Sequence, residues 1–108
     1  MKINFIYMTA GSTDEARKIA KALVTSKLAA CVNILDNMNS FYLWEGAIQD
    51  DREVVMIAKT TEDRVPQLIE KVKSLHSYSC PCIVSIPVSG GNPAFLEWIA
   101  EEVSPDVA

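Results

Sequence analysis

The residues best suited to chemistry gather in one short segment of the last third of the chain. His76, the only histidine, is followed by Cys80 and Cys82, and an apolar run to Val88 comes directly after them. Sulfur and imidazole ligands select soft ions, and two or three of them suffice for Cu(I). The thioether of Met8 could supply one more. The spacing therefore predicts a soft-metal site formed by His76, Cys80, Cys82 and Met8.

Simpler interpretations of the same residues stay open. His76 follows an expected helix and could cap its last carbonyls. Cys82 begins an expected strand, where a cysteine is often a small core residue. A structural zinc site usually has two ligand pairs, and Cys80-Pro81-Cys82 is only one. Catalysis is not predicted, because no third residue is evident that would orient a cysteine–histidine pair.

Four large amphipathic aromatics could line a ligand pocket or a contact between subunits, and the contact is the more ordinary explanation because such residues are enriched in interfaces. They are Tyr42, Trp44, Tyr78 and Trp98. The acidic run from Asp50 to Glu53 contains Arg52 and follows a turn, so we interpret it as a solvated hairpin tip and not as a hard-cation site.

The amino-acid composition indicates which classes of binding partner are not expected. The 108 residues are 49% hydrophobic and carry a net charge of −4, with ten basic residues scattered among fourteen acidic ones. A nucleic-acid partner is not expected without a basic stripe, and a membrane partner is not expected without a long apolar run. The first residues do not resemble a secretory signal. Three cysteines, an odd number, fit a reducing cytoplasm best.

The elements that must position these residues follow from hydrophobic periodicity and capping signals. The pattern predicts strands over residues 3–9, 31–35, 41–44, 53–59 and 82–88. It predicts helices from the Ser12–Glu15 capping box to Lys27, from Thr60-Thr61 through Pro66 to Leu75, and from Asn92-Pro93 to Val103. This β-α-β-β-α-β order with a final short helix predicts one α+β domain over residues 1–108: a ferredoxin-like antiparallel sheet with two helices on one face.

That arrangement leaves the other sheet face to be covered. A half-exposed antiparallel strand should alternate apolar and polar residues, but the segment from Val54 to Ala58 is apolar throughout. Two helices cover only one side, and another copy of the chain is the simplest cover for the second. We therefore expect an obligate homo-oligomer.

Motifs along nearly the whole chain resemble the CutA family, the divalent-cation tolerance proteins. They are Lys27-Leu28-Ala29-Ala30-Cys31-Val32-Asn33-Ile34, Tyr42-x-Trp44-Glu45-Gly46-x-Ile48, Glu53-Val54-x-Met56-Ile57-x-Lys59-Thr60, His76-x-Tyr78-x-x-Pro81-x-Ile83, Pro87, Gly91-Asn92 and Leu96-x-Trp98. The resemblance implies a cytoplasmic homotrimer associated with tolerance to copper and other divalent metals. It also implies inter-subunit clefts lined by Lys59, Tyr42, Trp44, Tyr78 and Trp98, with His76 as an imidazole ligand. No cofactor is required.

The chain departs from the family pattern at the metal-related positions. Cys82 stands where members usually have glutamate after the proline, and Met8 and Leu75 stand where copper-binding members have a cysteine and a histidine. The two thiols would make any surviving site softer. A signalling or scaffold module that docks on partner proteins without metal is the alternative function.

Overall fold

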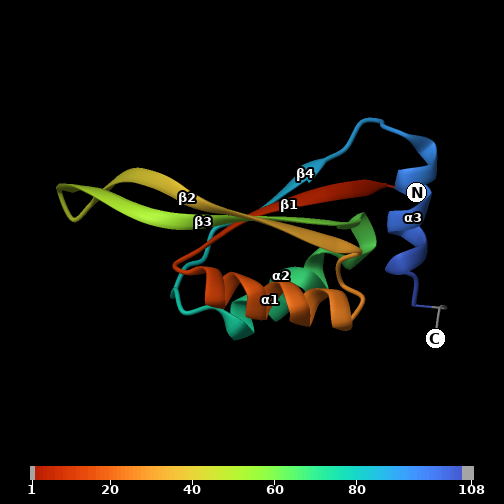
Figure 1. The fold of residues 1–108 in the computed structure, drawn as a ribbon, viewed down its shortest axis with the longest axis horizontal. Helices are drawn as coiled ribbons and strands as arrows, with labels where there is room; N and C mark the ends of the chain where they lie inside the picture. The colour runs from red at the N-terminus through yellow and green to blue at the C-terminus, as the bar shows by residue number, and fades with distance from the viewer. Residues whose placement is uncertain (1, 106–108) are drawn as a thin grey trace.

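The computed structural model describes residues 2–105, and its elements alternate as the sequence predicts. They are β1 (Ile3–Ala10), α1 (Thr13–Thr25), β2 (Cys31–Trp44), β3 (Ala47–Thr61), the 3-10 turn η1 (Glu62–Arg64), α2 (Val65–Leu75), β4 (Ile83–Pro87) and α3 (Pro93–Glu102). The strands form one antiparallel sheet in the order β2-β3-β1-β4. Helices α1 and α2 lie on one face and α3 lies at one end of the sheet (Figure 1). The α+β class and the antiparallel sheet with two helices on one face are confirmed. A single domain over 1–108 stays a prediction, because Met1 and residues 106–108 lie outside the described part.

Capping interactions fix two helix starts as the sequence indicated. The Ser12 hydroxyl accepts a hydrogen bond from the Glu15 amide at 3.2 Å, and a Glu15 carboxylate oxygen accepts one from the Gly11 amide at 3.2 Å. At α3, the Asn92 side chain accepts from the Ala94 amide at 3.2 Å and Pro93 occupies the first turn. Each cap satisfies amides that a helix leaves without an intrahelical partner.

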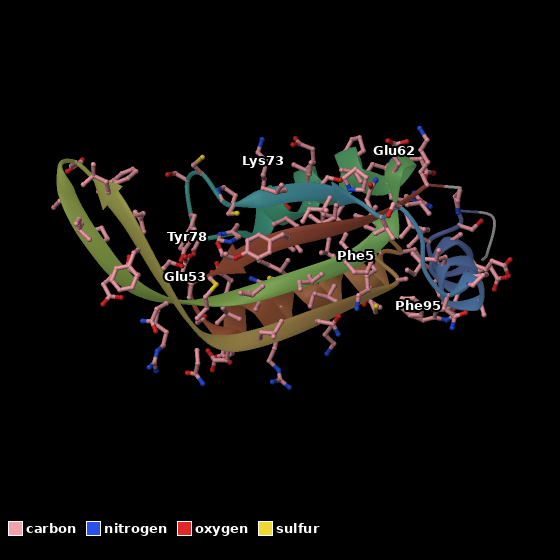
Figure 2. All side chains as sticks on the ribbon, turned by 90° about the horizontal axis from the view of Figure 1, so that it is seen from above. Phe5, Glu53, Glu62, Lys73, Tyr78 and Phe95 are labelled. Atoms are coloured by element: carbon pink, nitrogen blue, oxygen red, sulfur yellow. The ribbon has the colours of Figure 1, made fainter. Side chains whose placement is uncertain are left out.

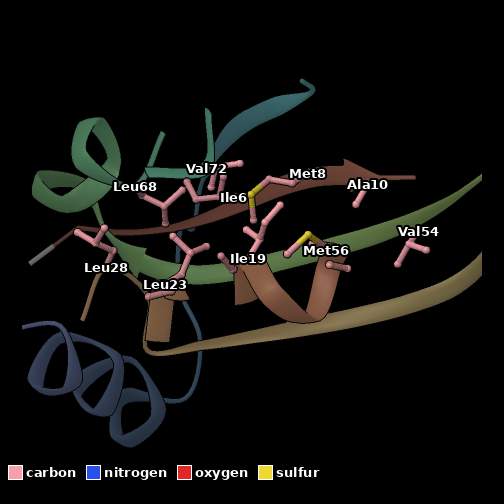
Figure 3. Packing of buried hydrophobic residues seen from close by; sticks show 13 residues of the cluster. Ile6, Met8, Ala10, Ile19, Leu23, Leu28, Val54, Met56, Leu68 and Val72 are labelled. Carbon is pink, nitrogen blue, oxygen red and sulfur yellow. The ribbon is translucent and has the colours of Figure 1, made fainter. Parts of the chain in front are cut away.

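The main core lies between the sheet and helices α1 and α2 (Figure 3). Alternate residues of β1 and β3 point toward the helices and are fully buried, as Ile6 and Met56 illustrate. Ile19 and Leu23 of α1 and Leu68 and Val72 of α2 complete the same cluster. Each such aliphatic side chain contributes about 1.5–3 kcal/mol when removed from water.

The hairpin of β2 and β3 is longer than predicted. The segment at Asp36-Asn37, expected to interrupt the strand, is instead a bulge between Leu35 and Met38 inside β2. Glu45 and Gly46, with φ of 49° and 80°, form the two-residue turn, and positive φ at both positions matches the twist of the strands. The hairpin extends well beyond the helices (Figure 1).

The predicted helix start at Thr60-Thr61 is wrong. These residues continue β3 and pair with Asn4 and Ile3 of β1, and α2 begins only at Val65. Threonine is β-branched and fits a pleated strand, so pairing with β1 outweighed its capping ability. Pro66 does lie in the first turn of α2.

The sheet face opposite the helices, which we call the open face, is largely apolar. Strand register places Tyr7 beside Ile57 and Val84, and Phe5 beside Ile86. Val84 and Ile86 are 50% and 49% exposed. Helix α3 covers only one end of this face, where Ile99 packs with Ile3 in a second buried cluster. No helix of the described residues has both the length and the apolar character needed to cross a membrane.

Candidate functional site

A pocket of about 500 Å³ lies between the outer half of the β2-β3 hairpin, from Glu53 to Trp44 beside the turn, and the loop between α2 and β4. Figure 2 shows Glu53 of the hairpin and Tyr78 of the loop meeting there. The lining residues are Thr9, Tyr42, Trp44, Gln49, Asp51, Glu53, Tyr78, Ser79, Cys80 and Cys82.

Strand alternation builds the hairpin wall of the pocket. Tyr42 pairs with Gln49, so these two and their neighbours two residues away share the face that lines the pocket. Asp51 and Glu53 therefore line the pocket, whereas Asp50 points to the other face and accepts a hydrogen bond from Asn39 at 3.4 Å. The acidic run that we interpreted as a solvated tip thus contributes two carboxylates to the pocket.

Each of these carboxylates holds a tyrosine hydroxyl. The Tyr42 hydroxyl donates to Asp51, and the Tyr78 hydroxyl donates to Glu53 at 3.0 Å. Burial and the hydrogen bond to Glu53 raise the pKa of Tyr78 to about 12. The hydrogen bond to Asp51 likewise raises the pKa of Tyr42 above its usual value. In both cases the carboxylate stabilises the neutral, proton-donating phenol.

His76 anchors the loop that carries Tyr78. Its side chain is fully buried, and its Nε2 lies 2.7 Å from the Thr9 carbonyl oxygen. Its Nδ1 accepts a hydrogen bond from the Tyr78 amide at 3.0 Å. Since Nδ1 accepts, the proton resides on Nε2, which donates to Thr9. Both ring nitrogens of the neutral imidazole are therefore used within the protein.

Glu15 ties the same loop to helix α1. Its second carboxylate oxygen accepts from the Ser77 amide at 2.7 Å and lies 4.0 Å from the His76 Nδ1. Burial opposes ionisation of Glu15, but hydrogen bonds from Ser77 and Gly11 outweigh it and lower the pKa of the carboxyl. The capping residue of α1 thus also positions the pocket loop.

The two loop thiols are free and exposed, and both line the pocket. Burial, and then the nearby charge of Glu53, raise the pKa of the Cys82 thiol. Cys31 is also a free thiol, but it lies on β2 outside the pocket.

Of the four soft-metal ligands predicted from sequence, the structure brings only Cys80 and Cys82 together in this pocket. Met8 does not join them: alternation along β1 points its side chain to the helix-side core, where it is fully buried, while its neighbour Thr9 lines the pocket. His76 lies behind the loop with both nitrogens engaged. Across residues 2–105, no three His, Cys, Asp or Glu side chains form a group able to hold a metal ion.

Of the five residues expected in a cleft, Tyr42, Trp44 and Tyr78 share the pocket and two lie elsewhere. Lys59 is on the open face, where it donates to Asn33 and lies 5.6 Å from the centre of the Phe5 ring. Trp98 stacks on Phe95 within α3, with ring centres 5.7 Å apart.

Sequence reasoning missed the pocket carboxylates, although a signal for them exists. A two-residue turn at Glu45-Gly46 fixes Trp44 opposite Ala47. Counting in steps of two from that pair places Asp51 on the same face as Tyr42. The contribution of Thr9 has no comparable signal, because it depends on how the loop packs.

In comparisons with known proteins, the relatives of this chain share the same description. The family model "CutA1 divalent ion tolerance protein" matches residues 4–102. The divalent-cation tolerance protein CutA of Archaeoglobus fulgidus is 49% identical over 100 residues, covering 93% of this chain and 97% of that protein. The protein of the same description from Thermus thermophilus is 45% identical over 96 residues, covering 89% and 93%.

Solved structures agree with the sequence relatives. The structure of the Archaeoglobus fulgidus protein, described as periplasmic, superposes with a TM-score of 0.92 at 48% identity and covers 94% of this chain and 99% of that one. The Thermus thermophilus structure gives a TM-score of 0.90 at 43% identity, with 93% and 97% covered.

Proposed function

This chain belongs to the CutA1 family of divalent ion tolerance proteins, and from that premise we propose that it is a non-enzymatic homotrimer that acts in tolerance to metal ions such as copper. Its working site is the pocket between the hairpin and the loop that joins α2 to β4. The observation that carries this proposal is the presence of two free, exposed thiols, Cys80 and Cys82, in the wall of one pocket.

The thiols suit a soft ion better than a hard one. Two thiolates favour Cu(I), whereas hard divalent ions are bound by a larger number of oxygen ligands. Each thiol must lose its proton to bind metal, so affinity should rise with pH. The raised pKa of Cys82 extends that rise to higher pH. His76 would act on the metal only indirectly, by holding the loop that carries both cysteines.

Anaerobic titration of the reduced protein with Cu(I), against a competing chelator, tests this assignment. We expect the Cys80→Ser/Cys82→Ser variant to lose at least about tenfold in affinity, a difference of about 1.4 kcal/mol. Cys31→Ser is the matched control, because it removes a free thiol outside the pocket. Equal affinity of the double variant and the wild-type protein would contradict the proposal.

The apolar open face supports the homotrimer. Val84 and Ile86 are half exposed in the single chain, and a second copy would remove them from water. We expect a folded trimer in sedimentation experiments at micromolar concentration and dissociation on Val84→Glu. Lys18→Glu, on the exposed side of α1, is the control for a change of charge and should leave the mass unchanged. A monomeric wild-type protein would rule the trimer out.

A non-enzymatic role is supported by the engagement of the only histidine. An imidazole whose nitrogens donate to Thr9 and accept from the Tyr78 amide cannot take a proton from a nearby thiol without breaking the loop anchor. The three free thiols are consistent with a reducing compartment, and we propose the cytoplasm. Cell fractionation with a tagged chain tests this location.

A scaffold function is the second candidate, because the hairpin exposes apolar residues on the side away from the pocket. Phe41, Leu43 and Ile48 are 70%, 69% and 76% exposed. Such a surface is suited to contact with another protein. Cross-linking at the hairpin followed by mass spectrometry distinguishes a foreign partner from a second copy of this chain.

A further inference from the structure

The pocket combines aromatic walls with negative charge. Tyr42, Trp44 and Tyr78 supply the rings, Asp51 and Glu53 supply the carboxylates, and none of the lining residues is basic. Its volume of about 500 Å³ lies within the range of small-molecule sites. A pocket of this size can hold a small molecule as well as a metal ion at the thiols.

The two carboxylates have no positive partner within the described chain. No Lys, Arg or His nitrogen of residues 2–105 comes within 4.0 Å of Asp51 or Glu53 in an ion pair. Their side chains accept hydrogen bonds from the hydroxyls of Tyr42 and Tyr78, which are neutral donors. The pKa values of Tyr78 and Cys82 are both raised in part by the charge of Glu53, so the negative field reaches the opposite wall.

Aromatic rings and carboxylates attract the same kind of ligand when it carries both a positive charge and apolar surface. A cation over the face of a Trp or Tyr ring is stabilised by the ring quadrupole, and quaternary ammonium groups are bound in this way. A hard metal ion is bound instead by several oxygen ligands. Across the described residues, moreover, no group of His, Cys, Asp and Glu side chains is arranged to hold one.

We propose that this pocket binds an organic ammonium cation, with its positive nitrogen toward Asp51 and Glu53 and its apolar substituents against Tyr42, Trp44 and Tyr78. The inference rests on the proposed function only in taking the same pocket as the working site. The metal would be held by Cys80 and Cys82, so the two ligands depend on different side chains.

Choline and its uncharged isostere 3,3-dimethyl-1-butanol provide the test, because they share shape and differ in charge. Binding is followed by fluorescence of Trp44 in the reduced, metal-free, full-length protein, in a Trp98→Phe background that removes the other tryptophan. We expect choline to bind about tenfold more tightly than the alcohol, within the range known for cation–π contacts. Equal affinities would overturn the proposal.

Charge variants locate the site. Asp51→Asn/Glu53→Gln should weaken choline binding about tenfold, a difference of about 1.4 kcal/mol. Binding of the alcohol should stay unchanged. Asp50→Asn is the matched control, since this carboxylate lies on the same strand but on the outer face of the hairpin. If Asp50→Asn weakens choline binding as much, the effect is general electrostatics and the proposal is wrong.

Two further outcomes separate this inference from its competitors. The first outcome is that the wild-type protein does not bind choline and the Asp51→Asn/Glu53→Gln variant changes in sedimentation mass. The pocket would then hold a basic side chain of another copy of the chain, and the proposal would be overturned. Cys80→Ser/Cys82→Ser should retain choline binding while losing Cu(I). A protein that binds Cu(I) but not choline would contradict only the ammonium proposal. A protein that binds choline but not Cu(I) would contradict only the proposed metal site.

Discussion

Replacing His76 should loosen the pocket loop by an amount that the geometry sets. His76→Phe keeps a ring in the buried site but removes the donor to the Thr9 carbonyl and the acceptor for the Tyr78 amide. A buried polar group left unpaired costs about 1–3 kcal/mol. Thr9 is only 7% exposed and would bear most of that cost, whereas Tyr78, at 37% exposed, can turn its amide toward water. The free energy of unfolding should therefore fall by about 2 kcal/mol.

Two variants calibrate the result. His76→Gln retains an amide donor that can reach toward Thr9, so the free energy of unfolding should fall by only about half as much. Ser79→Ala changes an exposed residue of the same loop and should stay within about 0.5 kcal/mol of the wild type.

Urea denaturation, followed by circular dichroism, measures these differences. All samples are compared at one protein concentration, because the stability of an oligomer depends on it. With a slope of about 1–3 kcal/mol per molar urea, a 2 kcal/mol loss moves the midpoint by roughly 1 M. A His76→Phe protein within about 0.5 kcal/mol of the wild type would refute the reasoning that His76 is a structural anchor.

Three further predictions concern titratable groups around the pocket. The absorbance change near 295 nm that Tyr78→Phe removes should occur at about pH 12, and Glu53→Gln should move it toward the ordinary value of 10.0. Because this pKa is raised on folding, the stability that Tyr78 contributes is complete below pH 10 and is lost as pH rises toward 12. The pKa of Glu15 is lowered from 4.5, so its contribution is present above that value and is lost as pH falls through the lower folded value. Glu15→Gln should accordingly cost more stability at pH 7 than at pH 3 in paired urea titrations. Finally, Cys82 in a Cys80→Ser protein should react with iodoacetamide at pH 8 more slowly than a free thiol, and adding Glu53→Gln should speed it, because burial and Glu53 raise its pKa.

Local chemistry made several features of the fold predictable. Ser12 and Asn92 carry short side chains that satisfy helix amides within the same few residues, so their capping roles are visible in the sequence. The absence of polar residues between Val54 and Ala58 indicated a strand with two apolar faces, and the open face of the sheet bears this out. Pro66 was likewise placed correctly in the first turn of α2.

Predictions failed where distant segments decide the outcome. Thr60 and Thr61 suit a helix start as well as a strand, and only pairing with β1 extended β3 through them. Asp36-Asn37 was predicted as a break, but the partner strand continues beside it and converts it into a bulge. The choice depends in each case on hydrogen bonds to residues far away in the sequence.

The sequence by itself determined the order of the elements, the apolar character of both sheet faces, the family, and the presence of thiols and aromatics near the pocket loop. Tertiary structure alone decided which of these side chains meet. Strand alternation sends Met8 into the core while Thr9 lines the pocket, and it turns Asp51 inward and Asp50 outward. A binding site depends on where each side chain points as well as on which residues are present. The direction of each side chain follows from register and loop packing, which are set by contacts between residues remote in the chain.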